Sequence, residues 1–278
     1  MHIPEFKTTF SSLVKPVVSA EKDALLSIAS LEALKQFIPS VDAVRNADLL
    51  PIAFNACVVN RFNLNDDGID SETATSIADL FIHKQINTEH NRNRVCGVIL
   101  SASFTEFGTD KLLTKEECKS RKDPFNITLG GVLWKVVNED LTKFVEESSD
   151  PTSPYYLNIS ASWELGFQKY QLALVEGDGK NLSSAEIISD PMEIAKLEDK
   201  LRARGGNGRI GDKKVFRLVS GDVLPLGIGL TVNPAADVRG IACNDLEEED
   251  ELHEELENAV KSAKDLTSLL RGISKKCK

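Results

Sequence analysis

Three polar residues spaced two apart, Ser160, Ser162 and Glu164, lie in the stretch NISASWELGF and offer a hydroxyl nucleophile beside a carboxylate. In a β-strand, residues two apart share one face, so the apolar residues between these three would form a core face. A serine hydroxyl becomes a useful nucleophile only when a base takes its proton and a third group orients that base. The spacing therefore indicates a strand able to serve acyl transfer in a cleft, or the solvated face of an edge strand.

Histidine is the natural base for such a serine because its pKa lies near neutrality. The chain has four histidines. His2 is terminal, His253 lies among acidic residues, and His83 ends an amphipathic segment. His90 stands in QINTEHNRNRVCGVI, where a polar turn runs into an apolar, strand-like segment. It is the candidate base, and the alternative is a surface histidine ahead of a strand.

The charge of the chain is concentrated in one place. The formal net charge is −10, and the stretch 245–257 holds nine acids with no Lys or Arg, so the remainder is nearly neutral. A body without a basic footprint argues against nucleic-acid binding. The five cysteines are scattered, which suits reduced thiols and offers no zinc site. The turn 63–70 resembles a calcium loop, but Ala74 stands where a bidentate Glu is needed. We expect no cofactor and no metal.

Hydrophobic periodicity predicts a β-rich chain with helices between the strands. Helices are expected at 21–37, at 72–84 with Ser71 as the cap, near 135–147, and along the acidic tail from residue 244. Strands are expected at 52–62, 94–104, 155–167, 170–179, 215–221 and 223–234, with 155–167 and 170–179 as a hairpin and 197–214 as a mobile insertion. The irregular order favours an α+β fold with a mostly antiparallel β-barrel wrapped by helices, and a long acidic C-terminal helix.

Three domains follow from this pattern: an N-terminal helical segment (1–50), a central domain (51–240) and an acidic helical tail (241–278). The N-terminus lacks a basic start followed by an apolar run, and no apolar run is long enough to span a bilayer. A soluble protein that works in the cytoplasm, without a membrane partner, is expected.

Three segments, in order, resemble the prohead maturation proteases of phages, closest to the T-even type. GIDSETATSIADLFIHKQINTEHNRNRVCGVI resembles the segment that carries their catalytic histidine, SASWELGF their serine strand, and LGIGLTVNPAADVRGI their late apolar strand. The resemblance covers roughly residues 50–240. It implies the barrel fold of the related herpesvirus assembly protease. It also implies a serine endopeptidase inside the procapsid, in the host cytoplasm, that cleaves scaffold protein, major capsid protein and itself during head maturation.

The resemblance also assigns roles to residues. His90 matches the general base, and aligning Ser-Trp-Glu on the family's Ser-Met-Glu selects Ser162 as nucleophile, with Ser160 as the second choice. Glu164 belongs to the same motif and is the first candidate for the third member. Glu89, Glu176 and Asp178 are the alternatives. The herpesvirus enzymes use a second histidine there, which this chain lacks between Ser162 and the tail. Backbone N–H groups of the Gly-rich loop near 204–208 are candidate oxyanion donors.

The tail matches the Leu-x-Glu pattern that such proteases prefer, at 246–248 and 252–254. Self-cleavage there is one hypothesis, and a plain solvated or coiled-coil helix is the other. A catalytically inactive, protease-like scaffold component of the procapsid is the alternative function. A homodimer or a higher oligomer stays open.

Overall fold

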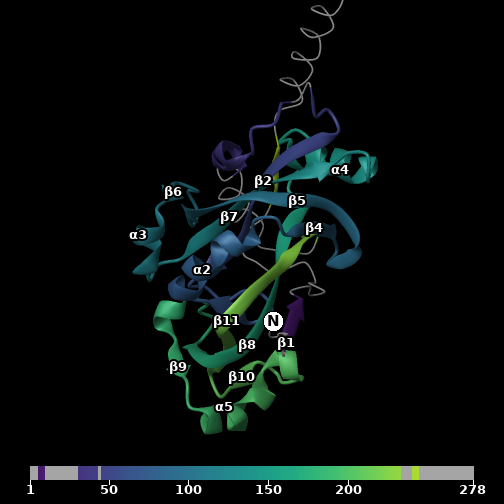
Figure 1. The fold of residues 1–278 in the computed structure, drawn as a ribbon. Coiled ribbons are helices and arrows are strands. Elements are labelled where there is room, and N and C mark those ends of the chain that lie inside the picture. Colours follow the sequence, from purple (N-terminus) through teal and green to yellow (C-terminus); the bar gives the residue numbers. More distant parts are fainter. Residues whose placement is uncertain (1–5, 10–30, 43–44, 233–239, 244–278) are drawn as a thin grey trace, which may run out of the picture.

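The structure is a computed structural model that describes residues 31–42, 45–232 and 240–243, together with the backbone of 6–9. Figure 1 shows the path of the chain, from the short strand near the N-terminus to the long central strands. The acidic tail from residue 244, its two Leu-x-Glu matches, and most of the helix expected at 21–37 lie outside the described residues.

Strands dominate the described part of the chain. They are β1 (Phe6–Thr9), β2 (Leu49–Val59), β3 (Asp67–Ile69), β4 (Gln85–Thr88), β5 (Asn91–Glu106), β6 (Leu112–Leu113), β7 (Phe125–Trp134), β8 (Ser160–Glu176), β9 (Glu186–Ile188), β10 (Arg209–Ile210), β11 (Lys213–Thr231) and β12 (Ala242–Cys243). The expected strands at 52–62 and 94–104 correspond to β2 and β5.

The helices are short and lie between the strands. The α-helices are α2 (Ser71–Ile77), α3 (Lys115–Lys119), α4 (Glu139–Ser149) and α5 (Pro191–Leu197), and the 3-10 helices are η1 (Lys35–Phe37), η2 (Ala78–Phe81), η3 (Leu182–Ser184), η4 (Glu198–Lys200) and η5 (Arg202–Arg204). The expected cap of the helix at 71 is wrong by one residue. Asp70 is the cap, since its carboxylate accepts from the Thr73 amide, and Ser71 is the first helical residue, whose hydroxyl donates to the Arg121 carbonyl instead.

One sheet joins all the strands, and it is open. Its main path runs β1-β8-β11-β4-β5-β7-β2-β12, and β3, β6, β9 and β10 pair beside it. Pairing is antiparallel throughout, except where β3 and β4 run parallel to β11. The fold is therefore α+β with a mostly antiparallel sheet, as expected. The closed barrel is wrong, because closure needs the end strands to pair with each other, and the described β1 and β12 do not.

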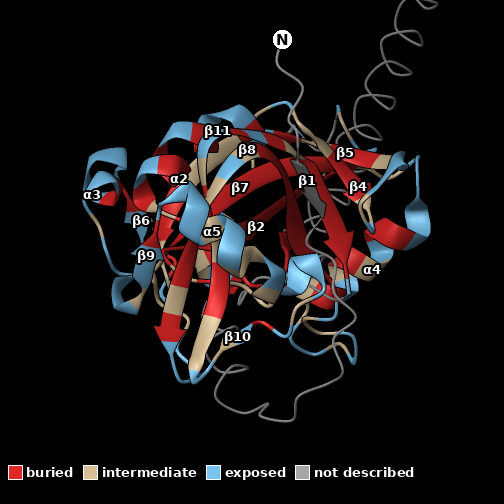
Figure 2. Cartoon of the chain, turned by 90° about the horizontal axis from the view of Figure 1, so that it is seen from below, coloured by how far each residue is buried: buried red, intermediate tan, exposed pale blue. Residues whose placement is uncertain are grey.

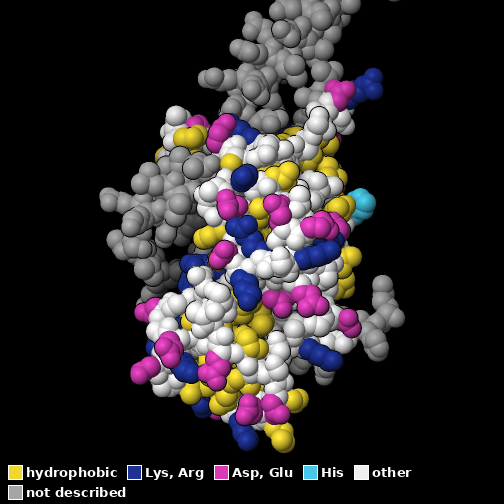
Figure 3. Space-filling view, turned by 90° about the vertical axis from the view of Figure 1, so that its left-hand side faces the viewer, with side chains coloured by type: hydrophobic (Ala, Val, Ile, Leu, Met, Phe, Trp, Pro, Cys, Tyr) yellow, Lys and Arg dark blue, Asp and Glu magenta, His cyan; other side chains and the backbone are white. Residues whose placement is uncertain are grey.

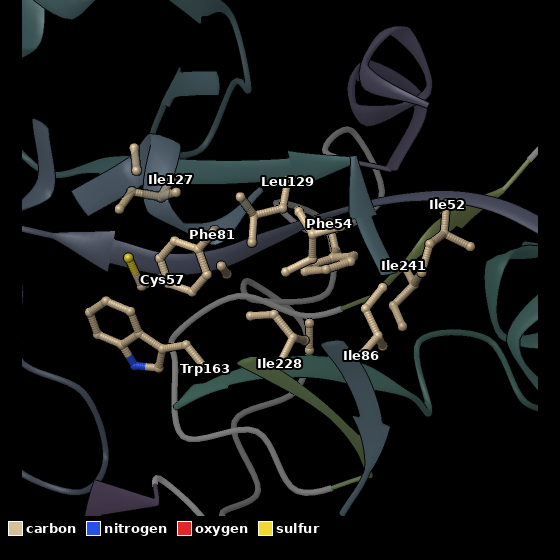
Figure 4. Packing of buried hydrophobic residues seen from close by; sticks show 14 of the residues in the cluster. Ile52, Phe54, Cys57, Phe81, Ile86, Ile127, Leu129, Trp163, Ile228 and Ile241 are labelled. Atoms are coloured by element: carbon tan, nitrogen blue, oxygen red, sulfur yellow. The ribbon is translucent and has the colours of Figure 1, made fainter. Parts of the chain in front are cut away.

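The main core lies between two halves of this curled sheet. Phe54 and Leu129 come from β2 and β7, and they face Ile86, Trp163 and Ile228 from β4, β8 and β11 (Figure 4). All five side chains are almost fully buried. Buried residues follow the strands, whereas α3 and α5 at the periphery are largely exposed (Figure 2). The core thus fixes the inner face of β8, and leaves its outer face for other groups.

Two strands are longer than the sequence indicated. The expected hairpin of 155–167 and 170–179 is wrong, since both segments belong to the single strand β8. The residues between Phe167 and Tyr170 are Gln and Lys, which offer no turn chemistry, so the strand runs through. The two late strands are likewise one strand, β11, which pairs with β8 along nearly its whole length, with a bulge between Ser220 and Val223.

The far halves of β8 and β11 carry a small lobe. One side of this ribbon packs Phe62 against Phe216, with ring centroids 4.4 Å apart. The other side buries Leu172, Leu201 and Val215 with helix α5. The expected insertion 197–214 is part of this lobe, where it forms η4, η5 and β10.

The central domain expected at 51–240 matches no sharp break in the sheet. β2 begins at Leu49, and β12 adds Ala242 and Cys243 to the edge of β2. Leu31 and Leu34 pack on Ala242, so residues from all three expected segments share one cluster. No helix in the described part is long and apolar enough to cross a membrane.

Candidate active site

His90 lies directly before β5, as the second residue of a two-residue β-hairpin turn between β4 and β5. Thr88 of β4 pairs with Asn91 of β5, and only Glu89 and His90 connect them. Both have positive φ, 52° for Glu89 and 57° for His90, which is the backbone of a type I′ turn. Such turns favour Gly and Asn, because the Cβ atom of most other residues clashes with the backbone at positive φ. The surroundings must therefore hold this turn in place.

Glu89 supplies part of that hold. Its backbone N–H donates to the Leu230 carbonyl over 2.9 Å. Its carboxylate accepts from the Thr231 hydroxyl over 3.0 Å and from the Val232 amide over 3.3 Å. These contacts fasten the turn to the end of β11. Glu89, an alternative catalytic acid from the sequence, is thus engaged with β11.

The His90 ring meets the carboxylate of Glu164. Nδ1 lies 3.1 Å from Oε1, and the two side chains are 5% and 1% exposed. A carboxylate accepts hydrogen bonds, so the contact assigns the proton of neutral His90 to Nδ1 and leaves a lone pair on Nε2. This is the tautomer in which a histidine can take a proton from a nucleophile while an acid orients it.

Glu164 has two further donors. Arg92 Nη2 lies 3.1 Å from Oε2, and Asn87 Nδ2 lies 3.4 Å from Oε1. Burial raises the pKa of Glu164, but the hydrogen bonds from His90, Arg92 and Asn87 outweigh it and hold this pKa below its ordinary value. Glu164 is therefore a carboxylate at neutral pH, able to stabilise an imidazolium.

Gly229 brings His90 next to Ser162. A Cβ atom at position 229 would stand 2.7 Å from His90 Nδ1 and 2.9 Å from Cε1, so the ring occupies the space that a side chain would need. Gly229 pairs directly with Ser162 across the β8–β11 ladder. Directly opposed residues of antiparallel strands point to the same face, with Cβ atoms about 5 Å apart. The ring and the Ser162 side chain are therefore neighbours on the outer face of the sheet.

Ser160 stands in a different environment. It pairs with Thr231 rather than with Gly229, and its hydroxyl accepts the Gly240 amide over 3.1 Å. Ser160 is thus two ladder positions beyond the glycine that accommodates the ring. The register favours Ser162 as the partner of His90, which is the serine that the motif alignment also selects, with Ser160 as its second choice.

The other two alternative acids are remote. Glu176 lies twelve residues along β8 from Glu164, roughly 40 Å at the rise of an extended strand. Asp178 follows it in an exposed turn, where it forms ion pairs with Arg209 and Lys214. The Gly-rich loop at 204–208 is also at that end, since Gly208 bonds to Val215. These groups belong to the small lobe and are not brought together with His90.

The second ring nitrogen of His90, Nε2, makes no hydrogen bond to the described residues. Nε2 is buried, and Oδ1 of Asn87 also lacks a hydrogen-bond partner among those residues. Buried polar atoms normally have partners, so such exceptions call for an explanation. A base whose acid contact is formed, and whose other nitrogen is open beside a serine, fits nucleophilic acyl transfer.

The outer face of β8 is closed in this structure. The alternation expected from the sequence is confirmed, because Ala161, Trp163 and Leu165 lie in the main core. The polar face was expected to look into a cleft or solvent, and that is wrong, since Ser160, Ser162 and Glu164 are all at most 2% exposed. Arg92, with 45% of its side chain exposed, connects this buried cluster to the surface.

Sequence reasoning missed three residues of the site: Asn87, Arg92 and Gly229. Gly229 carried a signal, since a glycine inside an apolar strand often marks a close approach of another group. Asn87 and Arg92 carried none, because their contacts with Glu164 cross more than seventy residues. Among the described residues, no group of three or more His, Cys, Asp and Glu could hold a metal ion.

Comparisons of the chain with protein-family models, with curated proteins and with solved structures found no match.

Proposed function

We propose that this protein is a serine hydrolase that cleaves peptide bonds, with Ser162 as nucleophile, His90 as general base and Glu164 as the acid that orients it. One observation carries the proposal: His90 contacts Glu164 through Nδ1, while its ring lies over Gly229 beside Ser162. A pair of this kind is arranged as the base and acid of a catalytic triad are.

The chemistry follows from these positions. Ser162 Oγ attacks the carbonyl carbon of the scissile bond and gives its proton to Nε2. The resulting imidazolium is stabilised by Glu164, then protonates the leaving amine as the C–N bond breaks. Water hydrolyses the acyl-serine by the reverse proton path. Glu164 keeps its negative charge throughout, in accord with its lowered pKa.

The finer proposal is a phage prohead maturation protease with the herpesvirus-protease-like fold, acting on scaffold and capsid proteins inside the procapsid. Its support is the order of the three resembling segments and the fact that two of them meet in space. The histidine segment forms β4 and the start of β5, and the serine strand is β8, with β11 between them.

A catalytically inactive structural component of the procapsid is the second candidate. The buried state of Ser162 favours it, because a peptide cannot reach a hydroxyl on a residue that is 1% exposed. The ion pair of Arg92 with Glu164 also favours it, since it gives the carboxylate a structural partner. The surface supports neither candidate further: on the face in Figure 3, acidic and basic side chains are interspersed.

The test compares the purified chain with its Ser162→Ala and His90→Ala variants on denatured protein substrates and on the chain itself. New termini are located by mass spectrometry. We expect new termini with the parent chain and none with either variant. Cleavage that is equal in His90→Ala would remove the enzymatic proposal and leave the structural one.

A matched control separates loss of chemistry from loss of fold. Asp178→Asn changes an acid in the small lobe, whose ion pairs are exposed, and should leave cleavage unchanged. Reaction of the parent with a fluorophosphonate should add one adduct, at Ser162. An adduct at Ser160 instead would reassign the nucleophile.

A further inference from the structure

The strand that carries Ser162 has its outer edge covered by the chain's own N-terminal strand. β1 runs antiparallel to β8, with Thr9 opposite Glu164 and Phe6 opposite Phe167. The other edge of β8 pairs with β11, over which the His90 ring lies. Figure 1 shows β1 beside β8 at the margin of the sheet. The candidate nucleophile thus lies on a strand between its base on one side and the β1 edge on the other.

From this arrangement we infer that the β1 edge of β8 is a docking edge for an extended peptide, and that β1 occupies it in the same chain. A peptide added as a strand to a sheet edge is a common mode of recognition, in which backbone hydrogen bonds supply affinity. The inference deepens the proposed function and rests on it only for the identity of the peptide as a substrate.

The ladder register gives the position of the scissile bond. β1 ends opposite Glu164, and Ser162 lies two residues further along the same edge. A peptide in the β1 register therefore places its second residue beyond the Glu164 position opposite Ser162. Its backbone would then lie about 5 Å from the nucleophile strand, on the side away from His90. Ser162 Oγ could then attack the peptide on one side and give its proton to His90 on the other.

β1 is suited to occupy this edge reversibly. It is four residues long, and its described pairing is with β8 alone. A tethered strand acts at a millimolar effective concentration, so it excludes a free peptide while it is in place. The edge would open to a peptide when β1 is released.

The test uses the full chain with Ser162→Ala, so that binding is measured without cleavage. Lys7→Pro and Thr8→Pro are made separately. Adjacent residues of a strand direct their N–H groups to opposite sides, so one proline removes a donor to β8 and the other faces away from it. The probe is a fluorescent synthetic peptide of residues 4–11, and a probe with proline at both positions is its control.

We expect at least one proline variant to bind the probe at least tenfold more tightly than the Ser162→Ala parent does. The same variant should not bind the control probe. Hydrogen exchange of the amides at 164–167 should rise in that variant and fall again with the probe. Two results would overturn the inference. One is exchange that stays protected in both variants. The other is an exposed edge that does not gain affinity for the probe.

Failure of the proposed function gives a different result. A proline variant that retains Ser162 and binds the probe, yet cleaves no peptide, would remove the protease and keep the docking edge. Cleavage by that chain without any probe binding would keep the protease and remove the docking edge. When both hold, cleavage sites should lie within one residue of the position opposite Ser162.

Discussion

Two buried polar clusters on the same sheet differ in what their residues can do. In the first, Asp110 accepts hydrogen bonds from Asn55, Thr105 and Asn126, over 2.7, 3.1 and 2.9 Å. In the second, Glu164 accepts from His90, Arg92 and Asn87. Asp110 and Glu164 are each 1% exposed. Each cluster also contains a non-glycine residue with positive φ, Asp110 in the first and His90 in the second.

The difference lies in the donors. Those named for Asp110 are neutral amides and a hydroxyl on β2, β5 and β7, which join three strands but transfer no proton near neutral pH. Glu164 is joined to a titratable imidazole beside a serine, and to an arginine that reaches the surface. Burial, positive φ and hydrogen bonding are therefore common to both clusters, and only the Glu164 cluster holds groups suited to proton transfer. Stability and activity should therefore respond differently to changes in the two clusters.

The largest effect is expected on catalysis. His90→Ala and Ser162→Ala should each lower kcat/KM by about 10³- to 10⁴-fold, because neither proton transfer nor acylation survives the loss of its residue. Asp110→Asn should change kcat/KM less than about threefold. Steady-state hydrolysis of a peptide identified by its new termini measures this. A comparable loss in folded Asp110→Asn would show that the two clusters are coupled.

Removing the carboxylate of the Asp110 cluster should cost the most stability. Asp110→Ala leaves buried donors of Asn55, Thr105 and Asn126 without their acceptor, and each such group costs about 1–3 kcal/mol. We expect the free energy of unfolding to fall by about 3 kcal/mol or more, measured by urea denaturation. A loss below about 1 kcal/mol would mean that water or other partners replace the carboxylate.

Gly229→Ala should displace the His90 ring. The new Cβ would stand 2.7 Å from Nδ1, so the ring must move and its bond to Glu164 lengthen. Overpacking of this kind costs about 1–3 kcal/mol, and we expect kcat/KM to fall about 10²-fold. Gly131→Ala is the matched control, with a Cβ 2.7 Å from the Val98 carbonyl oxygen. It should lose stability while the His90 ring signals in NMR spectra stay unchanged.

A smaller effect is expected from the contacts that hold the turn. Glu89→Ala removes the acceptors of Thr231 and Val232, and should lower the free energy of unfolding by about 1 kcal/mol. Glu89→Gln keeps one acceptor oxygen and should recover about half of that. If Glu89 only positions His90, Gln also restores most of kcat. A loss of kcat in Gln equal to that in His90→Ala would instead make Glu89 a catalytic acid.

The smallest effect is a change with pH. The pKa of Glu164 is lowered in the folded protein, so its contribution to stability is present above the ordinary glutamate pKa and is lost as the pH falls through the lowered one. As the pH rises from about 3 to about 6, the free energy of unfolding of the parent should increase relative to that of Glu164→Gln. A difference between the two that does not vary with pH would show that the carboxylate charge is not stabilised.

Several features of the site could be predicted from the sequence. The period-two pattern of NISASWELGF placed Ser162 and Glu164 on one face of a strand, and that face is the one that His90 meets. Strands β2 and β5 and a mostly antiparallel sheet were also predictable. The full length of the long strands was not, because a local pattern gives the faces of a strand and not its length, and only pairing with β11 shows that β8 continues through residues 168–169.

Local pattern by itself determined which residue types share a face, since alternation in a strand depends only on the backbone. It could not determine which face contacts which distant segment. The motif alignment ranks Ser162 and Glu164 first, but that Gly229 stands opposite Ser162 depends on the strand register, and that Glu164 meets His90 depends on a contact across 74 residues. Register and long-range contact are properties of the assembled sheet, because hydrogen bonds and packing between strands decide them.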